Sequence, residues 1–139
     1  MRDTNVSFAV RGTPIQEGNV SFGKGHSYHR EGDRLTAWRD EVGKRAKEAN
    51  RYRPPCDGPV RLFLIFTMPR GKTVKREEPT VNPDIDKLAR GILDALKGVL
   101  YNDDAQVVQL EAVKRYEGMH KPGVSVTAYM TTLAREATA

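Results

Sequence analysis

The segment from Val60 to Met68 constrains the fold more than any other part of the chain. In a strand, successive side chains point to opposite faces of the sheet. Four apolar residues of this segment share one face and two share the other: Val60, Leu62, Leu64 and Phe66, and Phe63 and Ile65. Apolar side chains on both faces are typical of a strand that lies inside a sheet. We therefore expect a β-sheet with this strand in a central position.

Two segments have helical periodicity. Ile85 to Lys97 carries one apolar stripe, and Gly98 follows where a glycine commonly ends a helix. A second helix is expected from Asp33, as its N-cap, to about Asn50. Its apolar residues recur at helical spacing: Leu35, Trp38, Val42, Ala46 and Ala49. The opposite side is rich in Lys and Arg, and a solvated face explains this as well as a binding partner does.

Three other segments alternate as strands do: residues 5–10, 107–116 and 124–130. Because Pro122-Gly123 precedes the last of them, we expect the last two strands to form a hairpin. Residues 11–32 and 69–83 have no sustained period and are expected to be long loops. The expected fold is α+β, a single domain over residues 1–139. It consists of a small mixed β-sheet of about four strands and two main helices. Along the chain, these strands and helices follow the order β-α-β-α-β-β.

Charge is distributed unevenly along the chain. The formal net charge is +5, and residues 1–83 carry +6 whereas residues 84–139 carry −1. A basic protein with an acidic cluster suits metal-assisted phosphate chemistry, because cations attract a polyanion and carboxylates hold the catalytic metal. No apolar run approaches the ~20 residues that span a bilayer. The single cysteine, Cys56, suits a reducing compartment, and we expect a cytoplasmic protein.

The acidic cluster has the pattern Asp-x-Asp, a helix, then Asp-Asp. Asp84 and Asp86 precede or begin the helix, and Asp103 and Asp104 follow it. Residues two apart in an extended segment share a side, so Asp84 and Asp86 can lie together if Asp86 caps the helix and Ile85 turns toward the core. Oxygen ligands of this kind suit Mg²⁺ or Mn²⁺. The histidines, His26, His29 and His120, lack the paired spacing of a zinc site.

Simpler explanations exist for each of these residues. Asp86 can be a helix cap only, Asp84 a first-turn residue favoured by the helix dipole, and Asn102-Asp103-Asp104 a turn. A helix of about thirteen residues is also roughly 20 Å long. Spacing alone therefore leaves open whether its two ends share one metal site.

The sequence resembles the RusA family of Holliday-junction resolvases, which is common in phages and prophages. Three motifs carry the resemblance most strongly: Pro83-Asp84-Ile85-Asp86-Lys87-Leu88, residues 92–101 (Ile-Leu-Asp-Ala-Leu-Lys-Gly-Val-Leu-Tyr), and Asn102-Asp103-Asp104-Ala105-Gln106-Val107-Val108. Lys114, the closing Pro122-Gly123-Val124 and the opening residues 8–14 (Phe-Ala-Val-Arg-Gly-Thr-Pro) also resemble family positions. The resemblance covers nearly the whole chain and implies a small mixed α/β homodimer that cuts branched DNA with Mg²⁺, or with Mn²⁺ in its place.

The resemblance also implies roles for individual residues. The essential aspartates of the family match Asp84, Asp86 and Asp104, with Asp103 adjacent, so the Asp-rich turn is expected to return to the Asp84/Asp86 site. Two positions depart from the family: Lys87 replaces an asparagine, and Arg90 replaces a catalytic lysine. An arginine keeps the positive charge but does not act as an acid near neutral pH, so Arg90 is expected to stabilise charge on the phosphate, a role open to Lys114 as well.

Binding to DNA is expected to rest on basic residues: Arg70, Lys72, Lys75, Arg76, Lys87 and Lys114. Residues 69–83 then form a flap that contacts DNA, although a plain solvated linker has the same composition. The expected activity is paired symmetric nicking of four-way and other branched junctions. The alternatives are a DNA-binding protein without catalysis and a metal nuclease with no preference for junctions.

Overall fold

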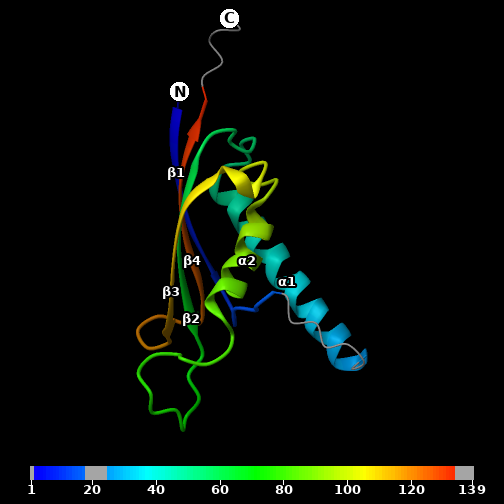
Figure 1. Ribbon diagram of the computed structural model, residues 1–139, viewed down its shortest axis with the longest axis vertical. Coiled ribbons are helices and arrows are strands. Elements are labelled where there is room, and N and C mark those ends of the chain that lie inside the picture. Colours follow the sequence, from blue (N-terminus) through cyan, green and yellow to red (C-terminus); the bar gives the residue numbers. More distant parts are fainter. Residues whose placement is uncertain (1, 18–24, 134–139) are drawn as a thin grey trace, which may run out of the picture.

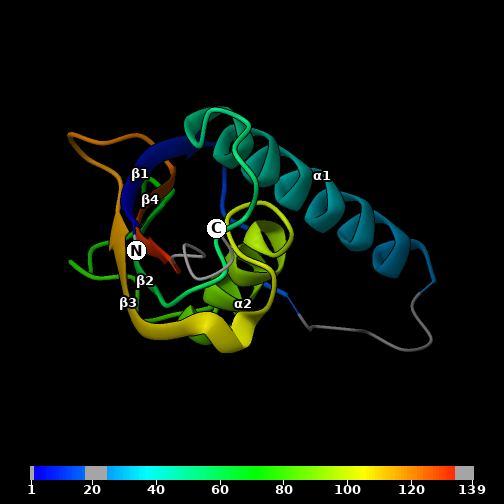
Figure 2. The same cartoon turned by 90° about the horizontal axis from the view of Figure 1, so that it is seen from above.

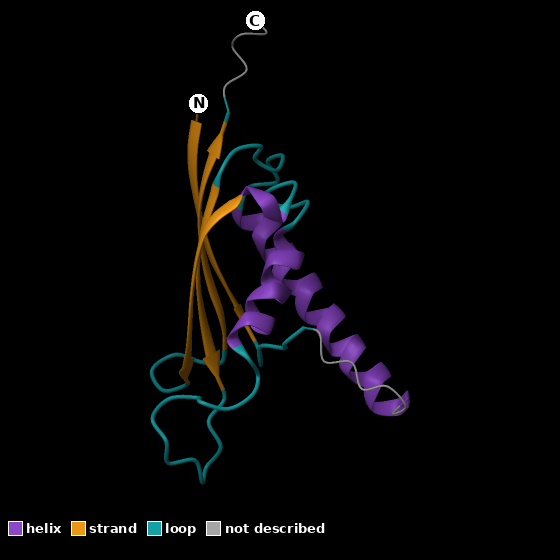
Figure 3. Ribbon diagram, in the orientation of Figure 1, coloured by secondary structure: helices purple, strands orange, loops and turns teal. Residues whose placement is uncertain are grey.

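The computed structural model describes residues 2–17 and 25–133, with the backbone alone described for residues 25–31. Its elements are β1 (Arg2–Arg11), α1 (Gly25–Ala49), β2 (Val60–Met68), α2 (Ile85–Leu96), the 3₁₀ turn η1 (Asp104–Gln106), β3 (Val107–Tyr116) and β4 (Gly123–Thr132). Four strands form one mixed sheet, and both helices cover the same face of it (Figure 1, Figure 3). The α+β class and the expected order of elements are confirmed.

The sheet has the strand order β1-β4-β2-β3, so β2 is central as its two apolar faces predict. It pairs antiparallel with β4 and parallel with β3. A parallel neighbour needs a crossover connection, which α2 supplies between β2 and β3. This strand–helix–strand unit places the two halves of the acidic cluster, Asp84 with Asp86 and Asp103 with Asp104, at the two ends of one helix.

The expected hairpin between the last two strands is wrong. β3 and β4 lie on opposite sides of β2, and residues 117–122 step across the end of β2 to join them. Two hydrogen bonds hold this step: the Glu117 amide donates to the Met68 carbonyl, and a Glu117 carboxylate oxygen accepts from the Arg70 amide. Alternation indicates that a segment is a strand but not which strand is its neighbour, and here the central strand takes both places.

The first helix begins earlier than expected. It begins at Gly25, so residues 25–32 are not part of a loop, and Asp33 lies inside α1 and does not cap it. The polar composition of residues 25–32 gives them no apolar period, and Figure 2 shows this end of α1 extending beyond the sheet. Further along, Trp38, Val42 and Ala46 are buried against the core, as their spacing predicts.

The N-cap of the second helix lies two residues earlier than the capping argument assumed. Asp84, with extended backbone, is the N-cap residue of α2, and Asp86 lies in the first turn. Ile85 is 38% exposed and does not turn into the core, whereas Leu88, Ile92 and Leu96 are fully buried. The C-terminal prediction is confirmed, because Gly98 has φ +81° just after the last helical turn.

The core lies between the sheet and the two helices and contains most of the buried apolar side chains, including Leu62, Leu64, Phe66 and Tyr101. Cys56 belongs to this core, and its burial raises the pKa of the thiol. No helix in the described part of the chain is long and apolar enough to cross a membrane.

Candidate metal and DNA site

The N-terminus of α2 presents two carboxylates to solvent. The side chain of Asp84 makes no capping hydrogen bond, is 51% exposed, and lies 3.7 Å from the ammonium group of Lys87. Asp86 is exposed, and no ion pair joins it to another described residue. Neither carboxylate is used to cap the helix, so both are available to a ligand. The explanation that Asp86 is only a helix cap therefore fails.

The segment after β1 fixes the backbone at this helix end. The side-chain oxygen of Gln16 accepts a hydrogen bond from the Asp84 amide at 2.8 Å, and the Glu17 amide donates to the Lys87 carbonyl at 3.2 Å. Arg39 of α1 lies 3.3 Å from the Glu17 carboxylate and 3.6 Å from that of Asp94. Burial and the neighbouring Asp94 raise the pKa of Glu17, although the charges of Arg39 and Arg90 oppose the shift.

Lys114 of β3 holds the loop that leads into α2. Its ammonium group donates to the carbonyls of Val81 and Pro83, each at 2.8 Å. Because Pro83 directly precedes Asp84, this lysine fixes the point from which the first aspartate extends. Its position is therefore close to the expected site, and two of its donors are already used within the chain.

The loop of residues 69–83 is attached to the end of β3 rather than free. The guanidinium groups of Arg70 and Arg76 lie 5.2 Å and 5.8 Å from the ring centre of Tyr116. Arg76 also donates to the Tyr116 hydroxyl at 2.8 Å, and Arg70 donates to the Val74 carbonyl. Two of the four expected DNA-contacting cations in this loop are thus packed on a tyrosine. Lys72 and Lys75 are exposed, as a contact with the DNA backbone requires.

The Asp-rich turn after α2 contains one structural and one available aspartate. Asp103 caps η1: its side chain accepts from the Ala105 amide, and the Gln106 side chain accepts from the Asp103 amide. Gln106 also donates to the carbonyls of Cys56 and Gly58, which attaches the turn to the preceding loop. Asp103 therefore performs the turn chemistry that the sequence allowed, and the neighbouring Asp104 does not.

Asp104 lies beside the buried Tyr101 near the last turns of α2. Burial, followed by the charges of Asp104 and Asp94, raises the pKa of the Tyr101 hydroxyl, which donates to the Leu93 carbonyl at 2.8 Å. The Oδ1 atom of Asp104 is shielded from solvent and has no hydrogen-bond partner of good geometry among the described residues, because the Tyr101 hydroxyl that contacts the Asp104 side chain donates to Leu93. A shielded carboxylate oxygen without a donor is costly, and a hard cation satisfies it well. The residue fits a role as a metal ligand.

One chain does not bring the three expected ligands together. Asp104 is close to Leu93, which is nine residues beyond Asp84 and therefore roughly 14 Å further along the helix. Figure 1 shows the segment that follows α2 at the opposite end of the helix from the loop that enters it. Among the described residues, no three His, Cys, Asp or Glu side chains are grouped so as to hold a metal ion. The expected return of Asp104 to Asp84 and Asp86 does not occur within the chain.

Arg90 is exposed on α2, one turn after Asp86 and one turn before Asp94. Its charge acts on Glu17, and no ion pair fixes its guanidinium group within residues 32–133 or 2–17. The side chain is therefore not held in one place by an ion pair with a described residue.

Sequence reasoning missed the polar residues that position the site, chiefly Gln16, Arg39, Tyr101 and Gln106. The spacing Asp103-x-x-Gln106 is that of a capping box and would have revealed the role of Gln106. Nothing in the local sequence marks Gln16 or Arg39, because their partners are distant in the chain.

Comparison with known proteins gives the family. Residues 11–129 match the family Endodeoxyribonuclease RusA. The chain is also 31% identical to the "Uncharacterized protein YqaN" of Bacillus subtilis (strain 168), over 87% of this chain and 93% of that protein. The family implies a nuclease of the Holliday-junction resolvase type and a requirement for divalent metal. By the extent of these matches, the chain belongs to the RusA endodeoxyribonuclease family.

Proposed function

We propose that this protein is a homodimeric endonuclease that uses Mg²⁺, or Mn²⁺ in its place, to nick four-way and other branched DNA at symmetric positions. The observation that carries the proposal is the pair of exposed carboxylates, Asp84 and Asp86, beside the basic loop of residues 69–83. Oxygen ligands next to phosphate-attracting cations are the arrangement that metal-assisted phosphodiester hydrolysis requires. Such an enzyme acts where the DNA is, in the cytoplasm of a bacterial cell.

The dimer is proposed because the metal ligands are divided between the two ends of α2. Mg²⁺ needs its ligand oxygens at about 2.0–2.1 Å, so Asp104 of the same chain is too far away to share an ion with Asp84 and Asp86. Two copies related by a twofold axis allow each pair to meet the Asp104 of the partner subunit. The edge strand β3 offers a surface for this contact, since Val108, Leu110 and Val113 are 57%, 42% and 52% exposed there.

Each residue then has a defined task. Asp84, Asp86 and Asp104 would hold the metal, which when bound would supply an activated nucleophile at neutral pH and a positive charge for the leaving oxygen. Lys114 positions the segment that carries Asp84, and Arg90 places a positive charge beside the scissile phosphate. Lys72 and Lys75 attract the DNA backbone. Asp103 supports the turn and leaves Asp104 as the ligand from that segment.

The first test is cleavage of a labelled four-way junction and a matched linear duplex, with Mg²⁺ and with EDTA. Metal-dependent paired nicks in the junction are expected. Binding of the junction without cleavage would show a DNA-binding protein, and equal cleavage of the linear duplex would show a nuclease without junction preference.

The second test separates one-chain from two-chain sites. Asp86→Asn and Asp104→Asn are each expected to abolish cleavage while DNA binding remains, because both remove a ligand charge and keep the side-chain size. When the two variants are mixed and allowed to exchange subunits, half of the dimers are mixed, and each mixed dimer has one intact site. About a quarter of the sites should then recover, and the product should be a single nick rather than a resolved junction. No recovery after proven exchange would contradict the shared site.

A further inference from the structure

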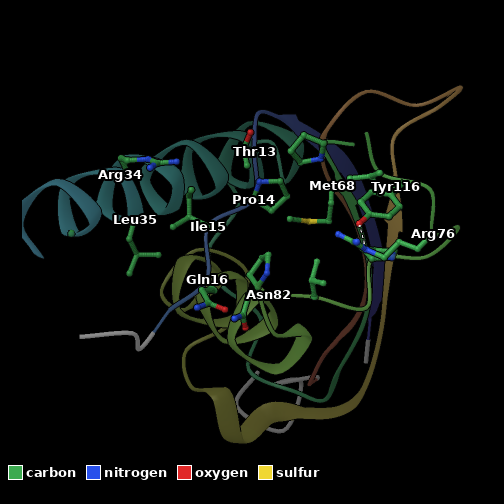
Figure 4. A pocket seen from close by; sticks show the side chains of 16 residues that line it. Thr13, Pro14, Ile15, Gln16, Arg34, Leu35, Met68, Arg76, Asn82 and Tyr116 are labelled. Atoms are coloured by element: carbon green, nitrogen blue, oxygen red, sulfur yellow. Dashed lines mark hydrogen bonds between the residues drawn. The ribbon is translucent and has the colours of Figure 1, made fainter. Parts of the chain in front are cut away.

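A cleft of about 570 Å³ lies directly beside the N-terminus of α2 and takes no part in the functions assigned above (Figure 4). The cleft is lined by residues from the segment that follows β1, from α1, from the ends of β2 and β3, and from the loop before α2. Figure 4 shows Gln16 and Asn82 on one side and Pro14 and Met68 on the other, with Tyr116 and Arg76 at one end and Arg34 at the opposite end. The volume is that of a pocket for a small organic group.

The chemistry of the lining selects the kind of occupant. The walls are mostly apolar, and no Asp or Glu is among the described residues that line the cleft, which argues against a metal ion. Two arginines stand at its ends, and Arg76 is already bonded to the Tyr116 hydroxyl, so few cations remain to hold a phosphate inside. The side-chain amide of Asn82 has no hydrogen-bond partner within the described residues, and the amide nitrogen of Gln16 is likewise unused there. A flat group with apolar faces and a polar edge fits this arrangement.

We infer that the cleft accepts one unstacked nucleobase of the DNA substrate. A nucleobase has two apolar faces and an edge of hydrogen-bond donors and acceptors, which side-chain amides recognise when enzymes take a base out of the stack. This inference rests on the proposed function, because it assigns a second contact between the same protein and the same DNA.

The position of the cleft relative to the carboxylates supports a base that belongs to the cleaved strand. Pro83 lines the cleft and is followed by Asp84, and Gln16 lines it while binding the Asp84 amide at 2.8 Å. A nucleotide whose base occupies the cleft therefore has its phosphate close to the metal ligands. Lys114 fixes the same wall through the Val81 and Pro83 carbonyls.

Extraction of a base also gives a reason for junction preference. A base leaves a continuous duplex only against pairing and stacking on both sides, and the cost is least where a base is already unpaired or poorly stacked. In an open four-way junction, the pairs at the branch point have lost a stacking neighbour. The cleft therefore favours the branch point over linear duplex without reading sequence in a groove.

The experiment uses 2-aminopurine, whose emission rises when it is unstacked, at the branch point of a junction in EDTA. Protein binding is measured separately by anisotropy of a distant label. At saturating protein, emission should rise at least about threefold at the branch point and not at a position ten pairs away or in linear duplex. Leu35→Trp, which fills the cleft, and Asn82→Ala, which removes an edge contact, should each lose most of this rise. Thr36→Trp, an exposed neighbour on α1 outside the lining, should keep it.

The outcomes separate the two claims. No binding of the junction in anisotropy contradicts the proposed function itself. Two results overturn the nucleobase assignment and leave the nuclease proposal in place. One is saturated binding with unchanged emission, and the other is a rise in Leu35→Trp and Asn82→Ala as large as that of the parent protein. Free deoxyadenosine monophosphate is the last arm. The inference is wrong if this nucleotide binds the parent with a Kd below about 1 mM, Leu35→Trp weakens that binding, and the emission of the junction does not change. The cleft would then bind a free nucleotide rather than a base of the DNA substrate.

Discussion

Replacement of Lys114 by methionine should uncouple the loop before α2 from the sheet. The ammonium group donates two hydrogen bonds of 2.8 Å to the Val81 and Pro83 carbonyls, and methionine keeps much of the length of the side chain without a donor. A hydrogen bond that involves a charged group contributes about 1.5–3 kcal/mol. Val81 is 46% exposed, so water replaces part of what its carbonyl loses. The expected loss is therefore about 2 kcal/mol rather than the sum of two full bonds.

This loss should be visible in both stability and cleavage. For a chain of 139 residues, about 2 kcal/mol lowers the Tm by roughly 5–10 °C. Single-turnover cleavage should fall by about 100-fold, since a displacement of about 1 Å at Asp84 has that effect on a positioned group. The matched control is Lys121→Met, an exposed lysine of the β3–β4 connection, which should behave as the parent in both assays.

Salt dependence distinguishes positioning from direct contact with DNA. If Lys114 bound a phosphate, its removal would reduce the slope of log Kd against log salt by about one. A positioning role leaves that slope unchanged while cleavage falls. A Lys114→Met protein with the Tm and cleavage rate of the parent would refute the positioning role of Lys114. A reduced slope with normal stability would show instead that Lys114 contacts the DNA directly.

Three further outcomes are expected. In single-turnover assays, Arg90→Lys should keep much of the cleavage rate and Arg90→Ala should lose most of it. Equal loss of cleavage in both variants would show that the two aligned donors of the guanidinium group are needed. An alanine variant as fast as the parent would show that Arg90 is not part of the site. Neutralising Lys72 and Lys75 together should lower the salt slope by about two, whereas Lys44→Ala with Lys47→Ala on α1 should leave it unchanged. Glu17→Gln should gain stability over the parent as pH rises above 4.5, by up to about 1 kcal/mol, because the raised pKa of Glu17 means that the fold disfavours its ionised form. Thermal unfolding of both proteins at pH 4 and pH 7 checks this, and a stability gain that is larger at pH 4 contradicts it.

Features with a local cause were predictable from the sequence. Gly98 ends α2 because its position after the helix needs a left-handed backbone, and that requirement is visible in the motif itself. The central place of β2 follows from its own two apolar faces. The family motifs likewise single out Asp84, Asp86 and Asp104 as candidate metal ligands from their own neighbours, and this assignment stays a prediction.

Features with a distant cause were not predictable. The start of α1 at Gly25 and the separation of β3 from β4 depend on packing between parts of the chain that the local pattern does not contain. The same holds for Arg39, which joins Glu17 to Asp94 across two elements. The candidate site was therefore predictable in its residue types and not in the geometry that connects them.

The carboxylates at the two ends of α2 also differ in how much they destabilise a single subunit without a metal ion. Asp84 and Asp86 are exposed to water, so holding them at the helix end without a metal costs little free energy, and Asp84 is also paired with Lys87. Asp104 has one shielded oxygen with no hydrogen-bond partner within the described part of the chain, which a native fold rarely tolerates unless the atom has a use. If the cation that satisfies this oxygen is held jointly with Asp84 and Asp86 of the partner subunit, metal binding and dimer formation stabilise each other. Mg²⁺ should then shift the monomer–dimer equilibrium of the parent toward the dimer, and sedimentation of Asp104→Asn should show no such shift.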